Sequence, residues 1–138
     1  MRLAAWMVAL LSCCVAPSAF ACAGAVPVGV LFNQGSSLLA ASERSSLEAA
    51  VRKARAAASH GQLQVALAIY SQDKEAGSKA ELNRLTEQRV RSLREGFALL
   101  GLQPASVVAV LGDPSALPAS AGEGGFAEVE IAYACGGS

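Results

Sequence analysis

The sequence predicts an α+β fold: a βαβαββ two-layer sandwich in which two helices pack on one mixed four-stranded sheet. Two observations lead to this prediction. Short runs rich in β-forming residues alternate with longer amphipathic stretches whose apolar residues recur every three or four positions. Strands that alternate with helices imply right-handed crossovers, with the helices packed on the sheet.

Residues 1–21 are predicted to be an export signal. Met1-Arg2 is a short positive region, residues 3–11 are apolar, and residues 17–21 end in an Ala-x-Ala cleavage pattern. The apolar run is too short to span a bilayer as a helix. The remaining residues, 22–138, suit one domain with a single core.

The first half of this domain is predicted to be a strand, a helix and a second strand. Residues 26–32 (VPVGVLF) are rich in β-formers, and residues 33–37 form a polar loop. A helix is expected over residues 42–59, and His60-Gly61 suits its C-terminal stop. Residues 63–70 alternate between apolar and other residues, which is typical of a strand.

A second helix is predicted from Ser78 to Gly101, after a polar loop over residues 71–77. Ser78-x-x-Glu81 is a capping-box signature, and Gly101 is a typical helix stop. The apolar stripe of this helix consists of Leu82, Leu85, Val90, Leu93, Phe97 and Leu100.

Two strands are expected to complete the chain. Residues 107–111 form the first, residues 112–114 turn the chain, and residues 118–125 are a loop of small residues. Residues 126–134 form the last strand, and residues 135–138 are a tail.

Arg89 breaks the pattern of the second helix, because it falls near the middle of the apolar stripe, between Leu85 and Leu93. A guanidinium turned toward the core must have partners or reach a water-filled cleft, since an unpaired buried charge is very unfavourable. Such exceptions are expected at functional sites. The alternative is that Arg89 reaches the sheet edge and meets a structural carboxylate.

Composition excludes several classes of function. The chain has 11 basic and 11 acidic residues, so there is no basic excess for nucleic acid. We expect no cofactor, no metal site and no enzyme activity, because no phosphate-binding loop occurs and His60 is the only histidine. A hydrolase that uses His60 with a serine and an acid is a weaker alternative, because no nucleophile-elbow motif supports it.

Cysteine positions suit an exported protein. Cys13 and Cys14 leave with the signal, whereas Cys22 and Cys135 remain at the two ends of the domain and are expected to form a disulfide. In the competing interpretation, Cys13 or Cys22 is lipidated, and only then would the protein be held at a membrane.

Several strings, in this order, resemble the OmpA-like C-terminal (peptidoglycan-associating) domain family over residues 26–133. Residues 30–36 (VLFNQGS) resemble its first strand and the following turn, and residues 85–89 (LTEQR) resemble the Leu-Ser-x-x-Arg string of its second helix. Residues 107–112 are similar to its third strand, and residues 129–131 (VEI) to its last strand.

This resemblance implies a non-enzymatic protein of the periplasm or outer membrane that binds peptidoglycan. A cleft would hold the diaminopimelate residue of the stem peptide, with Arg89 on its carboxylate and Asp73 on its ammonium. Asn33, Asn83 and Thr86 are further ligand-binding candidates by position. The resemblance also implies that the last strand lies antiparallel beside the first, which would bring the two remaining cysteines to the same end of the sheet.

The loop over residues 71–77 departs from the family pattern Gly-His-Thr-Asp-x-x-Gly. Tyr70-Ser71 stands for His-Thr, which puts Gln72 at the position of the acid and Asp73 one residue late. The alternative function is therefore a degenerate scaffold without wall binding, which acts as a protein–protein interaction module or as a subunit of an envelope or secretion assembly.

Overall fold

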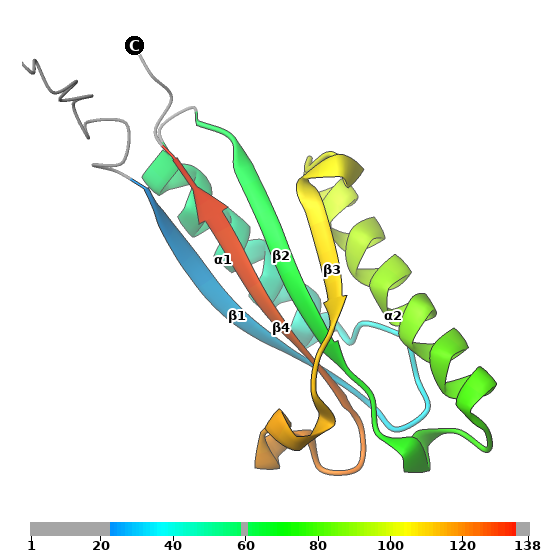
Figure 1. Cartoon of the computed structure of the whole chain (residues 1–138). Helices are drawn as coiled ribbons and strands as arrows, with labels where there is room; N and C mark the ends of the chain where they lie inside the picture. Colours follow the sequence, from blue (N-terminus) through cyan, green and yellow to red (C-terminus); the bar gives the residue numbers. More distant parts are fainter. Residues whose placement is uncertain (1–22, 59–60, 135–138) are drawn as a thin grey trace, which may run out of the picture.

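The computed structural model describes residues 23–58 and 61–134, and it confirms the predicted α+β architecture. Two helices cover one face of a four-stranded sheet (Figure 1). The main elements are β1 (Gly24–Phe32), α1 (Ala41–Ala58), β2 (Leu63–Tyr70), α2 (Lys79–Leu99), β3 (Val107–Leu111) and β4 (Gly125–Tyr133). Short 3₁₀ helices, which were not predicted, interrupt the loops: η2 (Asp73–Glu75), η3 (Pro104–Ser106), η4 (Pro114–Ala116) and η5 (Ala119–Ala121).

The sheet is mixed, with the strand order β1-β4-β2-β3. β4 is antiparallel to both of its neighbours, whereas β2 and β3 are parallel. Phe32 pairs with Gly125, and Tyr70 pairs with Phe126. The C-terminal ends of β1 and β2 therefore meet the start of β4 at one end of the sheet, and the loops that leave this end carry the candidate site.

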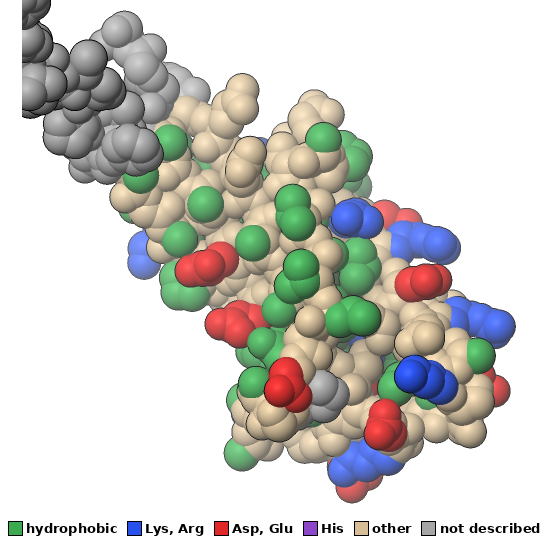
Figure 2. Space-filling model, viewed as in Figure 1, with side chains coloured by type: hydrophobic (Ala, Val, Ile, Leu, Met, Phe, Trp, Pro, Cys, Tyr) green, Lys and Arg blue, Asp and Glu red, His purple; other side chains and the backbone are tan. Residues whose placement is uncertain are grey.

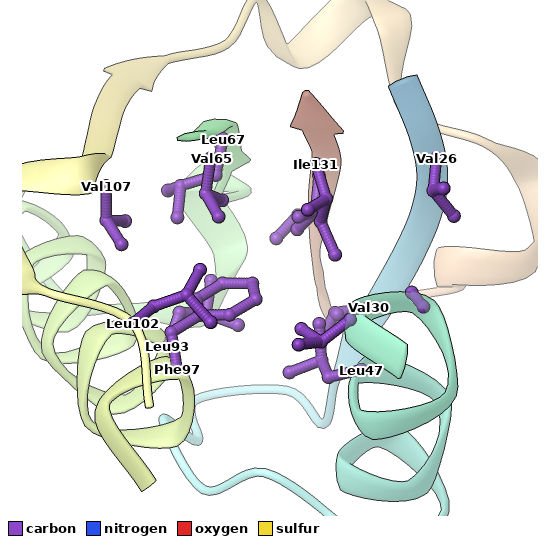
Figure 3. Packing of buried hydrophobic residues seen from close by; sticks show 14 of the residues in the cluster. Val26, Val30, Leu47, Val65, Leu67, Leu93, Phe97, Leu102, Val107 and Ile131 are labelled. Atoms are coloured by element: carbon purple, nitrogen blue, oxygen red, sulfur yellow. The ribbon is translucent and has the colours of Figure 1, made fainter. Parts of the chain in front are cut away.

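The core lies between the sheet and the two helices. Figure 3 shows aliphatic side chains of the four strands meeting Leu47 of α1 and Leu93 and Phe97 of α2. Burial of such side chains stabilises the fold by about 1.5–3 kcal/mol each. The fully buried strand residues include Val30, Val65, Leu67, Ile69, Val129 and Ile131.

α2 begins after the predicted capping residue Ser78 and ends just before the predicted stop at Gly101. The Ser78 hydroxyl accepts a hydrogen bond from the Glu81 N–H at 3.2 Å, which is one half of the expected capping box. The Glu81 carboxylate accepts from the Gly77 N–H instead of the Ser78 N–H. At the other end, Gly101 has φ of 87°, and the Leu102 N–H donates to the Phe97 carbonyl, as in a Schellman motif.

Several predictions fall on residues outside the described ranges. These are the export signal over residues 1–21, the role of His60, the lipidation of Cys13 or Cys22, and the bond between Cys22 and Cys135. Within residues 23–58 and 61–134, no helix is both long and apolar enough to cross a bilayer.

Candidate functional site

Arg89 is the centre of the candidate site, and its predicted inward orientation is confirmed. Its side chain has no exposed surface, and it lies on the buried stripe of α2 between the apolar Leu85 and Leu93. The guanidinium lies at the end of the sheet, 5.1 Å from the centre of the Phe32 ring. This distance is within the range of a cation–π interaction.

Every N–H of the Arg89 side chain has an acceptor. Nε donates to the Ser36 carbonyl at 2.9 Å, and Nη2 donates to the Asn33 carbonyl at 3.2 Å. Nη1 donates to Ser71 Oγ at 3.0 Å and to Glu75 Oε2 at 2.8 Å, and Nη2 also bonds Glu75 Oε1. An arginine side chain carries five N–H donors, so none remains for a ligand in this arrangement.

Glu75 is the acid that neutralises Arg89. Its carboxylate pairs with the guanidinium through both oxygens, and its side chain also has no exposed surface. It accepts two further bonds, from the Gln72 N–H at 2.9 Å and the Gly35 N–H at 3.2 Å. The carboxylate therefore joins three segments: the loop after β1, the loop after β2, and α2.

The pKa of Glu75 is lowered. Burial alone would raise the pKa of this carboxyl, but the hydrogen bonds and charge of Arg89, with the N–H groups of Gln72 and Gly35, outweigh burial. The charged form is thus favoured in the folded protein, and the pair is an ion pair.

Glycine at position 125 makes room for the guanidinium. A Cβ atom there would lie 2.3 Å from Arg89 Nη1 and 2.6 Å from its Cζ, which is closer than atoms can approach. The loop before β4 is also fixed by Gln72, whose side-chain amide donates to the carbonyls of Gly122 and Gly124 at 2.9 and 2.7 Å.

The structure does not bring the predicted ligand-binding residues into one cleft. Asp73 is exposed on η2 and shares a surface cavity of about 480 Å³ with Asn83, but neither Arg89 nor Thr86 lines this cavity. Asn33 reaches Arg89 only through its backbone carbonyl. Thr86 is buried, and its hydroxyl donates to Ser71 Oγ and to the Leu82 carbonyl.

Sequence reasoning identified Arg89 and gave a structural carboxylate as one alternative for its partner, and the structure shows such a carboxylate. The sequence did not identify it as Glu75, nor Ser71 as a further contact; the resemblance gave Asp73 a different role, contact with a ligand's ammonium. The available signal was that the loop after β2 carries two acids, either of which could have met a buried arginine. Among the described residues, no cluster of His, Cys, Asp and Glu is suited to a metal ion.

Removal of one member of the ion pair should destabilise the protein strongly. Arg89→Met leaves a buried carboxylate without a cation, and Glu75→Leu leaves a buried cation without an acid. Each is expected to lower the free energy of unfolding by about 3–5 kcal/mol in urea denaturation. The double variant should lose less than the sum of the two single losses. Additive losses would show that the two side chains do not act as a pair.

Acid should weaken the fold through Glu75. Because its pKa is lower in the folded than in the unfolded state, its stabilising effect is complete above about pH 4.3 and is lost as the pH falls through the folded value. Glu75→Gln should therefore show a shallower loss of the free energy of unfolding below that pH than the wild type does. Glu87→Gln is the control, because it removes a carboxylate from an exposed position of α2. Parallel wild-type and Glu75→Gln curves would contradict the assignment.

Gly125→Ala should displace the guanidinium. Overpacking of a filled site typically lowers the free energy of unfolding by about 1–3 kcal/mol. Gly96→Ala is the matched control, because its Cβ would meet only Leu39 Cδ1, at 3.4 Å, in the last turn of α2. There, alanine should raise stability by up to about 1 kcal/mol. Thermal denaturation of both variants tests the contrast, and equal midpoints would refute it.

Comparison with known proteins shows the fold. No protein-family model and no curated protein sequence matches the chain. The OmpA-like domain of FopA1 from Francisella tularensis subsp. tularensis SCHU S4 superposes with a TM-score of 0.57 at 13% identity, over 86% of this chain and 79% of that one. The peptidoglycan-associated lipoprotein from Burkholderia pseudomallei gives 0.58 at 18% identity, over 75% and 88%. The chain therefore has the fold of an OmpA-like C-terminal domain.

Proposed function

We propose that this protein is a non-enzymatic component of the cell envelope whose OmpA-like domain serves as a protein-interaction scaffold. We call the buried site around the Arg89 guanidinium the Arg89 pocket. In this proposal the Arg89 pocket is part of the architecture, because the Glu75 carboxylate occupies it. The fold and the export signal expected over residues 1–21 support an envelope location, in the periplasm or at the outer membrane.

The saturation of Arg89 carries this proposal. A ligand carboxylate could bind the guanidinium only by displacing Glu75, which already provides the bidentate geometry such a ligand would use. Displacing Glu75 would break an internal ion pair and the two bonds that its carboxylate accepts from the Gln72 and Gly35 N–H groups. A free carboxylate would therefore exchange one ion pair for another and gain little net binding energy.

Peptidoglycan binding is the second candidate function, and two observations favour it. Arg89 lies beneath the loops at the end of the sheet, and Asp73 and Asn83 share a cavity next to η2. Movement of η2 would withdraw Glu75, so that Arg89 could take the carboxylate of diaminopimelate and Asp73 its ammonium. One solved structure with this fold is named a peptidoglycan-associated lipoprotein.

A disulfide between Cys22 and Cys135 fits either function. Gly24 pairs with Tyr133 at the end of the β1–β4 ladder, and each cysteine lies two residues beyond this pair in the sequence. Lipidation at Cys13 or Cys22 is the competing proposal, and intact mass spectrometry of the mature protein distinguishes the two.

The two functions differ in whether the pocket accepts an external carboxylate. We expect the melting temperature of the wild type to be unchanged by acetate or by diaminopimelate, because Glu75 occupies the site. Glu75→Ala removes an acetate-sized group, so acetate should raise its melting temperature where the same concentration of chloride does not. We also expect purified sacculi to retain the wild type and Asp73→Asn equally, because in the scaffold proposal Asp73 binds no ligand.

Retention of the wild type on sacculi that diaminopimelate competes away would replace the scaffold proposal with wall binding. Arg89→Met is informative in this assay only when circular dichroism shows it folded. Asp73→Asn alters an exposed side chain and therefore serves as the main variant.

A further inference from the structure

The face of the sheet opposite the helices has an unusual surface. In antiparallel pairs with one solvated face, outward residues are usually polar. Here most outward residues of the four strands are small or apolar, as the burial pattern shows. They include Ala25, Pro27, Gly29, Leu31, Ala66, Ala68, Val108, Val110 and Ala132. We call this surface the open face, and Figure 2 shows its apolar side chains.

Two carboxylates stand in the middle of the open face. Glu128 and Glu130 are exposed on β4, which lies between β1 and β2. Glu128 is paired with Gly29 and Ala68 on the two neighbouring strands. Glu130 is in turn paired with Pro27 and Ala66. These neighbours are too short to cover the carboxylates and carry no charge. Both side chains are exposed, and Glu128 accepts a hydrogen bond from the Tyr70 hydroxyl through one oxygen, Oε2.

The edge of the open face is apolar and accessible. Val108 and Val110 of β3 are 61% and 58% exposed, although valine is usually buried. They line a shallow depression of about 160 Å³ together with Ala66, Ala68 and the two glutamates. Contiguous exposed apolar surface on a soluble domain indicates an interaction site.

Charge is segregated between the two faces of the molecule. The four strands contain no Lys or Arg, and Glu128 and Glu130 are their only charged residues. The basic residues of the described chain lie on α1, η2 and α2. The two long helices pack against the other face of the sheet, and η2 lies in the loop after β2. Neither glutamate forms an ion pair within residues 23–58 and 61–134; the one polar partner of Glu128 there is the Tyr70 hydroxyl, at 3.2 Å.

We propose that the open face docks an amphipathic helix of another protein, with two basic residues at positions i and i+4 beside its apolar stripe. This inference deepens the scaffold function proposed above and rests on it. Glu128 and Glu130 are two strand residues apart, about 6.6–6.8 Å. One helical step of four residues rises about 6 Å, so two Lys or Arg side chains match the two carboxylates.

The neighbouring surface fits the apolar stripe of such a helix. The small residues around the glutamates allow a close approach, and Val108 and Val110 provide the apolar edge. Face-to-face pairing of two copies is disfavoured, because it would bring four carboxylates together without a cation. The partner is therefore a different protein with the opposite charge.

A designed peptide tests the proposal on the full exported chain. The probe is a fluorescent helical peptide with a Leu/Ala stripe and Lys at i and i+4, and the comparison peptide has Glu at these two positions. We expect the Lys peptide to bind in fluorescence anisotropy, more weakly as salt increases, and the Glu peptide not to bind. Glu128→Gln/Glu130→Gln should weaken binding at least about tenfold, corresponding to about 1.4 kcal/mol.

Glu87→Gln/Glu95→Gln is the matched control, because it removes the same charge from exposed positions on α2. It should bind the Lys peptide as the wild type does. In Ala66→Arg, an internal cation next to Glu130 should abolish binding while the melting temperature shows a folded domain. Absence of binding by the Lys peptide, or equal binding by Glu128→Gln/Glu130→Gln and the wild type, would overturn the docking site.

The outcome is separable from that of the function proposed above. Wall binding is read through diaminopimelate competition at the Arg89 pocket, at the end of the sheet. Peptide binding is read through Glu128 and Glu130 on the open face. If the protein binds sacculi through Arg89 and also binds the Lys peptide, the proposal that Glu75 closes the Arg89 pocket is wrong, and the docking site on the open face stands.

Discussion

The buried pair of Arg89 and Glu75 organises one whole end of this molecule. The guanidinium bonds two carbonyls of the loop after β1, and the carboxylate ties the loop after β2 to the same point. Neither side chain is exposed to solvent, so the charge of each must be compensated by the other. The loops at this end therefore derive their conformation from one ion pair and a set of backbone hydrogen bonds more than from apolar packing.

The same pair gives the Arg89 guanidinium a structural role within an OmpA-like fold. An inward arginine at the end of the sheet suits a carboxylate, whether the carboxylate belongs to a ligand or to the chain itself. Here the carboxylate that pairs with the arginine belongs to the chain itself, at Glu75. The scaffold is retained, and recognition, in our proposal, moves to the opposite face of the sheet.

Much of the fold was predictable because it depends on local patterns. Alternation in β2, the helical stripe of α2 and the stop at Gly101 are all properties of neighbouring residues. The inward position of Arg89 was predictable for the same reason, because the helical period alone places it in the stripe.

The partner of Arg89 was harder to predict because it depends on a loop conformation. Asp73 and Glu75 are two residues apart, and the unpredicted turn η2 sends one to solvent and the other to the guanidinium. A 3₁₀ turn has three residues per turn, so these two side chains point in different directions. No periodicity in a seven-residue loop encodes this choice. The steric role of Gly125 was equally hidden, since it depends on a contact between residues far apart in the sequence.

The missing side chain at Gly125 also links the evolution of two distant positions. The guanidinium occupies the volume that a Cβ atom would need, so position 125 is constrained only while position 89 holds a large cation. An arginine at position 89 therefore disfavours any side chain at position 125. Loss of the arginine would lift this constraint, but only together with a change at position 75, because the Glu75 carboxylate would otherwise stay buried without a cation.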